Sequence, residues 1–128
     1  MRVLLDTCTF LWMLSGDAAL SVRARAVILD PASELFLSAA SSWEIAIKAA
    51  LGKIKMRDAP RLVVPAQMSE NGIAALEISH SHALRTHDLP RHHADPFDRL
   101  LVAQADLEDL VLLSPDRLFR PYDVRVLW

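Results

Sequence analysis

Short, unbroken apolar runs that end at polar residues are the feature that most limits how this chain can fold. Val3–Leu5 stops at Asp6, and Val111–Leu113 stops at Ser114. A strand with one solvated face alternates apolar and polar residues, so a continuous run indicates a strand buried on both faces, as in a parallel sheet covered by helices. Three further strands are predicted, over Glu34–Ser38, Ile73–Ile78 and Val124–Leu127.

Helical patterns lie between these strands. The clearest covers Ser41–Leu51, where apolar residues recur at helical spacing and Gly52 follows as a stop. The other predicted helical segments are Phe10–Leu14, Leu20–Leu29, Pro60–Glu70, His80–Thr86 and Pro96–Leu107, with a polar loop at His87–Ala94 and a helical turn at Ser114–Phe119. Strands that alternate with helices predict an α/β sandwich with a mostly parallel sheet, and 128 residues are enough for one domain spanning the chain.

Composition and charge exclude several classes of protein. The chain is 52% hydrophobic, too apolar for a disordered segment, and its net charge of −2 excludes a generally basic nucleic-acid coat. A single cysteine, Cys8, excludes an intrachain disulfide framework and a cysteine zinc cluster, and favours the reducing cytoplasm. No apolar run approaches the ~18 residues that span a bilayer, and Asp6 interrupts what would be a secretory signal.

Four acidic residues are predicted to lie at one edge of the sheet. Asp6 follows the first strand, and Asp116 lies three residues after Leu113. Glu44 opens the helix after the second strand, and Asp98 opens the helix after the polar loop. Because ligands bind beyond the carboxyl ends of parallel strands, this placement predicts a functional site.

Each acid also has an ordinary structural explanation at the start of a helix. Ser41 and Glu44 have the spacing of a capping box, and Glu44 can pair with Lys48 one turn later. Asp95-Pro96 is typical of an N-cap followed by proline, Asp98 then suits the positive end of the helix dipole, and Ser114-Pro115-Asp116 repeats the pattern.

Two observations favour a functional explanation. Asp98 shares a helical face with Leu101, Val102 and Ala105, and a carboxylate on a buried face is costly unless it is paired or bound to a metal. Asp6 has no capping pattern as obvious as the others. Converging carboxylates repel one another, and a divalent cation removes that penalty; oxygen ligands are those that Mg²⁺ or Mn²⁺ prefers. Such a site can activate a water and neutralise a phosphodiester transition state.

Four segments carry a resemblance to a known family. They are VLLDT from Val3, SxWEIAIK from Ser41 to Lys48, HxADPFDRLLVAQA ending at Ala105, and LLSPDRLF from Leu112 to Phe119. In this order they resemble the PIN-domain ribonucleases, and in particular the VapC-type toxins of bacterial toxin–antitoxin pairs. The resemblance covers essentially the whole chain and implies a PIN-like three-layer α/β/α sandwich.

The resemblance also implies an activity and its residues. Asp6 and Asp98 would be the main metal ligands, with Glu44 and Asp116 completing the cluster. Asp95 would cap its helix and help to hold a second metal position, and Thr7 and Ser114 would donate hydrogen bonds to the carboxylates. The family implies Mg²⁺-dependent cleavage of RNA by an endonuclease, a homodimer, and inhibition by a cognate antitoxin.

Basic residues are expected to contact the RNA mainly through arginine, because the chain has only three lysines, at positions 48, 53 and 55. The arginines in or near the loops that flank the acids are Arg85, Arg91, Arg99, Arg117 and Arg120. Some of them are expected to contact phosphates. For any single arginine, an ordinary place on the surface is the alternative explanation. Trp12, Trp43 and Trp128 are interpreted as core or interface anchors.

Other functions stay open at this stage. Five histidines between His80 and His93 suggest a zinc site, but their spacing matches no helical zinc motif. A phosphatase or phosphotransfer protein with Asp6 as nucleophile is a second alternative, although no lysine follows Lys55 and Cys8 stands where a phosphatase has a second Asp. A third is a PIN-like binding module without catalysis. For the toxin, an apolar groove from the first two helices is predicted to accept an antitoxin helix or strand, and in a binding module the same helices would serve a partner equally well.

Overall fold

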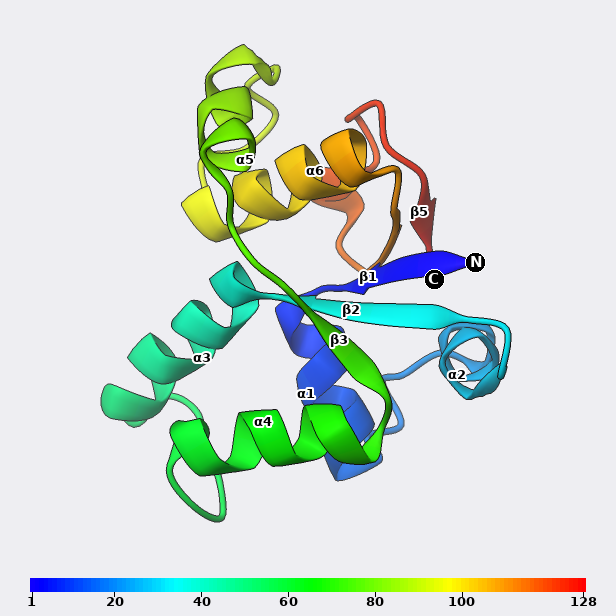
Figure 1. Cartoon of the computed structure of the whole chain (residues 1–128), viewed down its shortest axis with the longest axis vertical. Coiled ribbons are helices and arrows are strands. Elements are labelled where there is room, and N and C mark those ends of the chain that lie inside the picture. The colour runs from blue at the N-terminus through cyan, green and yellow to red at the C-terminus, as the bar shows by residue number, and fades with distance from the viewer.

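The computed structural model describes all 128 residues, and its centre is a parallel five-stranded sheet (Figure 1). The strands are β1 (Arg2–Leu5), β2 (Glu34–Ser38), β3 (Ile73–Leu76), β4 (Val111–Leu113) and β5 (Val126–Leu127). The helices are α1 (Thr7–Ser15), α2 (Val22–Leu29), α3 (Ala39–Ala50), α4 (Pro60–Glu70), α5 (His80–Arg85) and α6 (Pro96–Glu108), with short 3₁₀ turns η1 (Thr86–Asp88) and η2 (Arg117–Phe119).

The strands are arranged in the order β3-β2-β1-β4-β5, so β1 is central. Leu5 pairs with Leu37 of β2 on one side and with Leu113 of β4 on the other. All pairs are parallel, so the residues that follow β1, β2 and β4 emerge at the same edge. The predicted fold class is confirmed.

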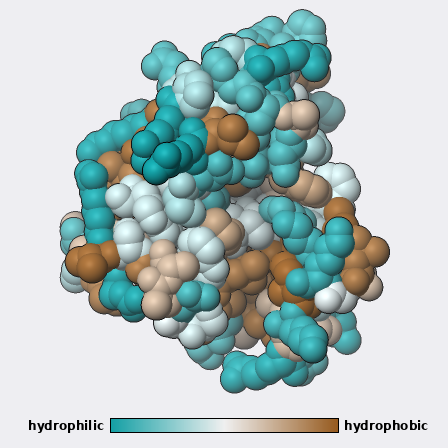
Figure 2. Space-filling model, turned by 180° about the vertical axis from the view of Figure 1, so that it is seen from behind, coloured by the Kyte–Doolittle hydropathy of each residue, from teal (hydrophilic) through white to brown (hydrophobic).

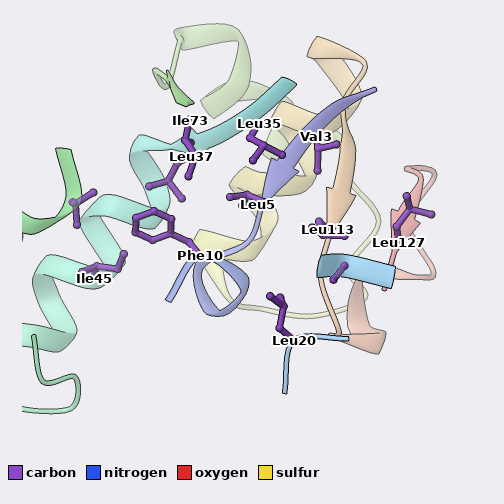
Figure 3. Close-up of a cluster of buried hydrophobic side chains, with 12 residues drawn as sticks. Val3, Leu5, Phe10, Leu20, Leu35, Leu37, Ile45, Ile73, Leu113 and Leu127 are labelled. Carbon is purple, nitrogen blue, oxygen red and sulfur yellow. The ribbon is translucent and has the colours of Figure 1, made fainter. Parts of the chain in front are cut away.

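One face of the sheet packs against α1, α2, α4 and part of α3. Val3 and Leu5 of β1 point to this side, where they meet Phe10 of α1 and Ile45 of α3 (Figure 3). Phe10 is fully buried and lies among the strand side chains in Figure 3. This layer holds α1 in place, and the start of α1 lies directly after β1.

The opposite face packs against α6, with α5 beside it. Leu4 of β1 points to this side, where it meets Leu101 and Val102 of α6 and Phe119 of η2. Figure 1 shows α5 and α6 together on one side of the sheet and α1, α3 and α4 on the other. Alternate residues of one buried strand therefore fill two cores, which explains why Val3–Leu5 are all apolar.

The element boundaries differ from the prediction at two helix starts. α3 begins at Ala39 because Ser38 caps it, so Ser41 and Glu44 lie inside the helix and the predicted capping box is wrong. α1 begins at Thr7 because the Asp6 carboxylate accepts a hydrogen bond from the Thr9 N–H, so Asp6 is a helix cap after all. The same helix ends where expected, at Gly16, whose φ of 65° is readily adopted by glycine.

The last segments are shorter than predicted. β3 ends at Leu76 and β5 spans only Val126–Leu127. The helical turn predicted over Ser114–Phe119 is a 3₁₀ segment that begins only at Arg117, after its cap Asp116. None of the helices combines the length and the apolar character needed to cross a membrane.

Candidate active site

Four acids reach one region from separate elements. Asp6 follows β1, Glu44 lies in α3, Asp98 lies in the first turn of α6, and Asp116 follows β4. β1 and β4 are neighbouring parallel strands, so Asp6 and Asp116 follow adjacent strand ends. Long-range folding therefore assembles a group of carboxylates that are up to 110 positions apart in the chain.

Asp6 is the most buried of the group, with 5% of its surface exposed. Its Oδ1 accepts a 2.8 Å hydrogen bond from the Thr9 N–H, and its Oδ2 accepts one from the Ser114 hydroxyl. The Cys8 Sγ lies 3.3 Å from both carboxylate oxygens. Burial raises the pKa of Asp6, and the hydrogen bonds from Ser114, Thr9 and Cys8 partly oppose this rise.

Glu44 is held by α1 and by its own helix. The Thr7 hydroxyl donates a 2.6 Å hydrogen bond to Oε1, and the Lys48 ammonium donates one of 2.7 Å to Oε2. The Thr7 oxygen also lies 3.0 Å from the Ser41 hydroxyl, and since its one proton goes to the carboxylate, it accepts from Ser41. The hydrogen bond to Glu44 raises the pKa of Lys48, so its ammonium stays charged.

Asp98 shows most clearly that the acids influence one another. Burial, and after it the negative charges of Asp95, Glu44, Asp116 and Asp6 in that order, raise its pKa to about 7. Its side chain is 23% exposed, so the inward stripe predicted for this helix ends at a half-buried carboxylate. A carboxyl group that four other carboxylates disfavour when charged lies where a cation would be stabilised.

The supporting residues have definite places. Asp95 caps α6 by accepting from the Phe97 and Asp98 N–H groups at 2.9 and 3.1 Å, and it is itself exposed. Ser114 is buried; besides donating to Asp6, it accepts from the Asp116 N–H at 3.1 Å. Asp116 in turn accepts from the Leu118 N–H at 2.9 Å. Thr7 and Ser114 thus both donate to carboxylates of the group.

The donor set suits a hard divalent cation more than a closed metal cage. The structure contains no group of three or more His, Cys, Asp or Glu side chains arranged to hold a metal ion. Mg²⁺ commonly takes one or two carboxylates, keeps several waters and shares substrate phosphates, so it does not need such a group. The acidic side chains around Asp98 fit a cation of this kind, because all of them offer carboxylate oxygens and their negative charges raise the pKa of Asp98.

The arginines divide into two kinds. Arg99 donates to the carbonyl oxygens of Thr86, Leu89 and Pro90 at 2.7, 3.2 and 2.9 Å, so its guanidinium holds the loop before α6 instead of facing solvent. Arg85 is paired with Asp106 at 2.8 Å. Of the five arginines expected near the acids, Arg91, Arg117 and Arg120 are exposed and have no side-chain partner, and Arg91 borders a polar hollow beside His87.

The histidines are scattered in role. His82 is buried and contacts Glu108, whereas His87 is 93% exposed. They form no metal-ligand group, so the zinc alternative has no support. Sequence reasoning missed His93, whose buried ring lies 3.4 Å from Asp98. His93 is the residue marked x in HxADPFDR, five positions before Asp98. Its closeness to Asp98 in the chain was the only sequence feature that pointed to a contact between them.

The fold and this group of acids define a class of protein. The model of the PIN domain matches residues 3–124, and the chain belongs to the PIN domain family. The expected family membership is thereby confirmed. The surroundings of Asp6 also weigh against its acting as a phosphoryl acceptor, because both of its carboxylate oxygens are already hydrogen-bonded and the side chain is buried.

Individual relatives narrow the comparison. Ribonuclease VapC16 of Mycobacterium tuberculosis is 40% identical over 69 residues, which is 54% of this chain and 48% of that protein. The match thus spans about half the length of that relative. VapBC2 from Rickettsia felis, solved bound to a DNA fragment from its promoter, has a TM-score of 0.74 at 13% identity and covers 99% of this chain and 98% of its own.

A toxin–antitoxin complex from Klebsiella pneumoniae has the same fold. Its TM-score is 0.65 at 18% identity, and the match covers 98% of this chain and 96% of that one. At such low identity these two structures establish the fold, and they agree with the VapC-type resemblance of the sequence.

Proposed function

We propose that this protein is a divalent-cation-dependent endoribonuclease and the toxin of a toxin–antitoxin pair. The observation that carries the proposal is that carboxylates from other elements, Glu44, Asp116 and Asp6, lie near enough to Asp98 for their charges to raise its pKa, at one edge of a PIN fold. The name of the M. tuberculosis relative supports the ribonuclease activity, and the similar toxin–antitoxin complexes support the toxin role. The cytoplasm is the expected site of action.

Asp6 and Asp98 are the proposed main ligands of Mg²⁺, for which Mn²⁺ would substitute. Glu44 and Asp116 complete the negative region, while Thr7, Ser114 and Asp95 hold it in place. When bound, the cation neutralises phosphate charge and lowers the pKa of water. The residues of the chain orient the carboxylates, and Arg91 and Arg117, both exposed, are the proposed contacts for phosphates of the RNA.

The decisive experiment measures cleavage of total RNA by protein purified without antitoxin. Wild type is expected to cut RNA in Mg²⁺ or Mn²⁺ and to stop in EDTA. Asp98→Asn should abolish cutting while the unfolding midpoint stays at or above that of wild type. The matched control, Asp123→Asn, changes an exposed carboxylate in the loop before β5 and should leave the rate unchanged. RNA left intact by the wild type in both cations would favour a non-catalytic binding module.

We propose that the antitoxin docks against an apolar hollow of about 490 Å³. It is lined by Leu11 and Leu14 of α1, by the segment around Met56, and by Val63 of α4. The predicted groove between the first two helices is therefore corrected: α4 and not α2 forms its second wall. Figure 2, seen from behind, shows hydrophobic side chains gathering in the half of the molecule that holds α1, α3 and α4.

A charge placed in this hollow tests the docking. Val63→Asp should weaken complex formation with the coexpressed antitoxin and release toxicity, whereas the exposed Leu84→Asp on α5 should do neither. Unchanged copurification of toxin and antitoxin after Val63→Asp would contradict this surface.

A homodimer is proposed through α3. Trp43, Ile47 and Leu51 lie one helical turn apart and are 59%, 37% and 64% exposed, an unusual stripe for a free helix. Leu51→Glu should convert a dimer to a monomer in light scattering, and Leu29→Glu, on the exposed face of α2, should not. A wild type that is monomeric at micromolar concentration would contradict the dimer.

A further inference from the structure

His93 is a buried polar group that the proposed function does not yet use. Its side chain is 7% exposed and packs edge-on against the rings of Phe119 and Tyr122, with ring centres 5.7 and 5.5 Å away. Its Nε2 makes no hydrogen bond and lies 3.4 Å from Oδ2 of Asp98. A buried polar atom without a partner is costly, so its position beside the acids calls for an explanation.

The hydrogen bonds around His93 assign the position of its ring proton. The Arg99 guanidinium lies 3.2 Å from the Tyr122 hydroxyl oxygen and can only donate, so that oxygen accepts. The same hydroxyl lies 2.8 Å from Nδ1 of His93. Its own proton is free to be donated to Nδ1, which makes Nδ1 the acceptor and places the proton of the neutral ring on Nε2.

The opposite tautomer satisfies fewer groups. With the proton on Nδ1, the lone pair of Nε2 would face a carboxylate oxygen of Asp98, and the two would repel. The tyrosine proton would then have no acceptor, because His93 and Arg99 are the only hydrogen-bonding partners of that hydroxyl. The first assignment gives every proton an acceptor or directs it toward one.

We propose that His93 is a positioning residue for Asp98. Its Nε2–H lies beside the carboxylate and donates to it once Asp98 turns toward the ring, and Arg99 and Tyr122 keep the ring in the donating tautomer. Arg99 also holds the loop that carries His93, through the carbonyl oxygens of Thr86, Leu89 and Pro90. This inference rests on the proposed function, because it takes Asp98 to be a metal ligand. Hydrogen-bonded partners orient metal-binding carboxylates and strengthen metal binding.

Both separation and orientation keep the contact from being a hydrogen bond. At 3.4 Å, Nε2 and Oδ2 are farther apart than in most N–H···O bonds, and the ring N–H is not aligned with the oxygen. The donor is therefore available when the carboxylate turns toward it.

Tyr122→Phe removes the hydroxyl that donates to His93 and leaves the packing of the aromatic ring unchanged. This substitution therefore disturbs the tautomer of His93 alone.

The first test reads the tautomer directly in metal-free protein. Nitrogen NMR of the imidazole at pH 8 is expected to show His93 protonated on Nε2 in the wild type, and a mixture of tautomers in Tyr122→Phe. A wild-type ring protonated on Nδ1 would overturn the inference whether or not the protein cleaves RNA.

The second test measures Mn²⁺ affinity by calorimetry. His93→Asn places its amide near the Nδ1 position and should weaken binding about 10- to 100-fold. His93→Gln can place an N–H near Nε2 and should retain most of the affinity, and His87→Asn, at an exposed position, should retain all of it. Unfolding midpoints measured in parallel show that each variant is folded.

The outcomes separate this inference from the proposed function. Equal affinity for His93→Asn and wild type would overturn the positioning role while the metal site stood. Loss of affinity in His93→Gln as large as in His93→Asn would mean that the imidazole nitrogen binds the metal itself, which also overturns it. A wild type that binds no Mn²⁺ would overturn the proposed metal site and this role together.

Discussion

The Thr7 hydroxyl donates a 2.6 Å hydrogen bond to Oε1 of Glu44, across 37 positions of the chain. It joins the first residue of α1 to the middle of α3, and both side chains are buried. The contact therefore links one acid of the candidate site to the end of β1, where Asp6 stands. Asp6 and Asp116 also accept hydrogen bonds, from the Thr9 N–H and the Ser114 hydroxyl and from the Leu118 N–H, whereas no hydrogen bond reaches the Asp98 carboxylate.

Replacement of Thr7 by valine tests this link. Valine keeps the shape of threonine and removes the donor, so Glu44 loses a hydrogen bond to a charged group, and the free energy of unfolding should fall by about 1–3 kcal/mol. Thr7→Ser retains the hydroxyl, so its free energy of unfolding should fall by less. Urea unfolding of both variants gives the comparison; an equal loss in both would show that the methyl group, and not the hydrogen bond, matters.

Asp98→Asn should change the dependence of stability on pH in metal-free protein. The pKa of Asp98 is about 7 in the folded state and near 3.8 when unfolded, so the folded state binds more protons between these values. Wild-type stability should therefore fall as the pH rises from about 4 through 7, and the full penalty should remain above 7.

Asparagine has no such charge, so its gain in stability over wild type should be larger at pH 8 than at pH 5. Unfolding curves in EDTA at the two pH values measure this difference, and added Mg²⁺ should stabilise wild type more than the variant. The same difference between the proteins at both pH values would contradict the convergence of charges on Asp98.

Phe10→Ala should be among the most damaging core substitutions. The ring is completely buried between the sheet and α3 (Figure 3), so its removal should lower the free energy of unfolding by about 3–5 kcal/mol. Leu29→Ala on α2, where the side chain is 72% exposed, should change it by less than about 0.5 kcal/mol. Comparable losses in chemical unfolding of the two variants would mean that the core is misplaced.

His82→Leu should loosen α5. The His82 Nδ1 accepts a 3.0 Å hydrogen bond from the Ser79 N–H, so Nε2 donates to Glu108 at 2.8 Å. Leucine fills the space but leaves the Ser79 N–H without its acceptor, so the free energy of unfolding should fall by about 1–3 kcal/mol. Faster amide exchange at Ser79 and through α5 should accompany it. His87→Leu, which changes an exposed ring, should leave that exchange unaltered.

The sheet and the placement of its acids could be predicted because both depend on local patterns. Val3–Leu5 is apolar at every position, which indicates burial on both faces, and Asp6 follows it directly. One topological rule then places the acids of a parallel sheet at a common edge. Helix starts were harder, because several residues compete to cap each one. Ser38 and Ser41 are both good caps, and only the position of β2 selects the first.

The roles of polar side chains depended on contacts between distant residues. Arg99 was expected to face RNA, but its guanidinium holds a loop ten or so residues back. His93 meets Tyr122 across 29 positions, and no local pattern signals that pair.

The amino-acid sequence by itself thus determined the layers, the family and the edge at which the acids gather, because hydrophobic periodicity and short motifs act over a few residues. The tertiary structure alone decided how strongly the carboxylates affect Asp98 and which donors hold them, because electrostatic and hydrogen-bond energies depend on distances that only the packed chain sets.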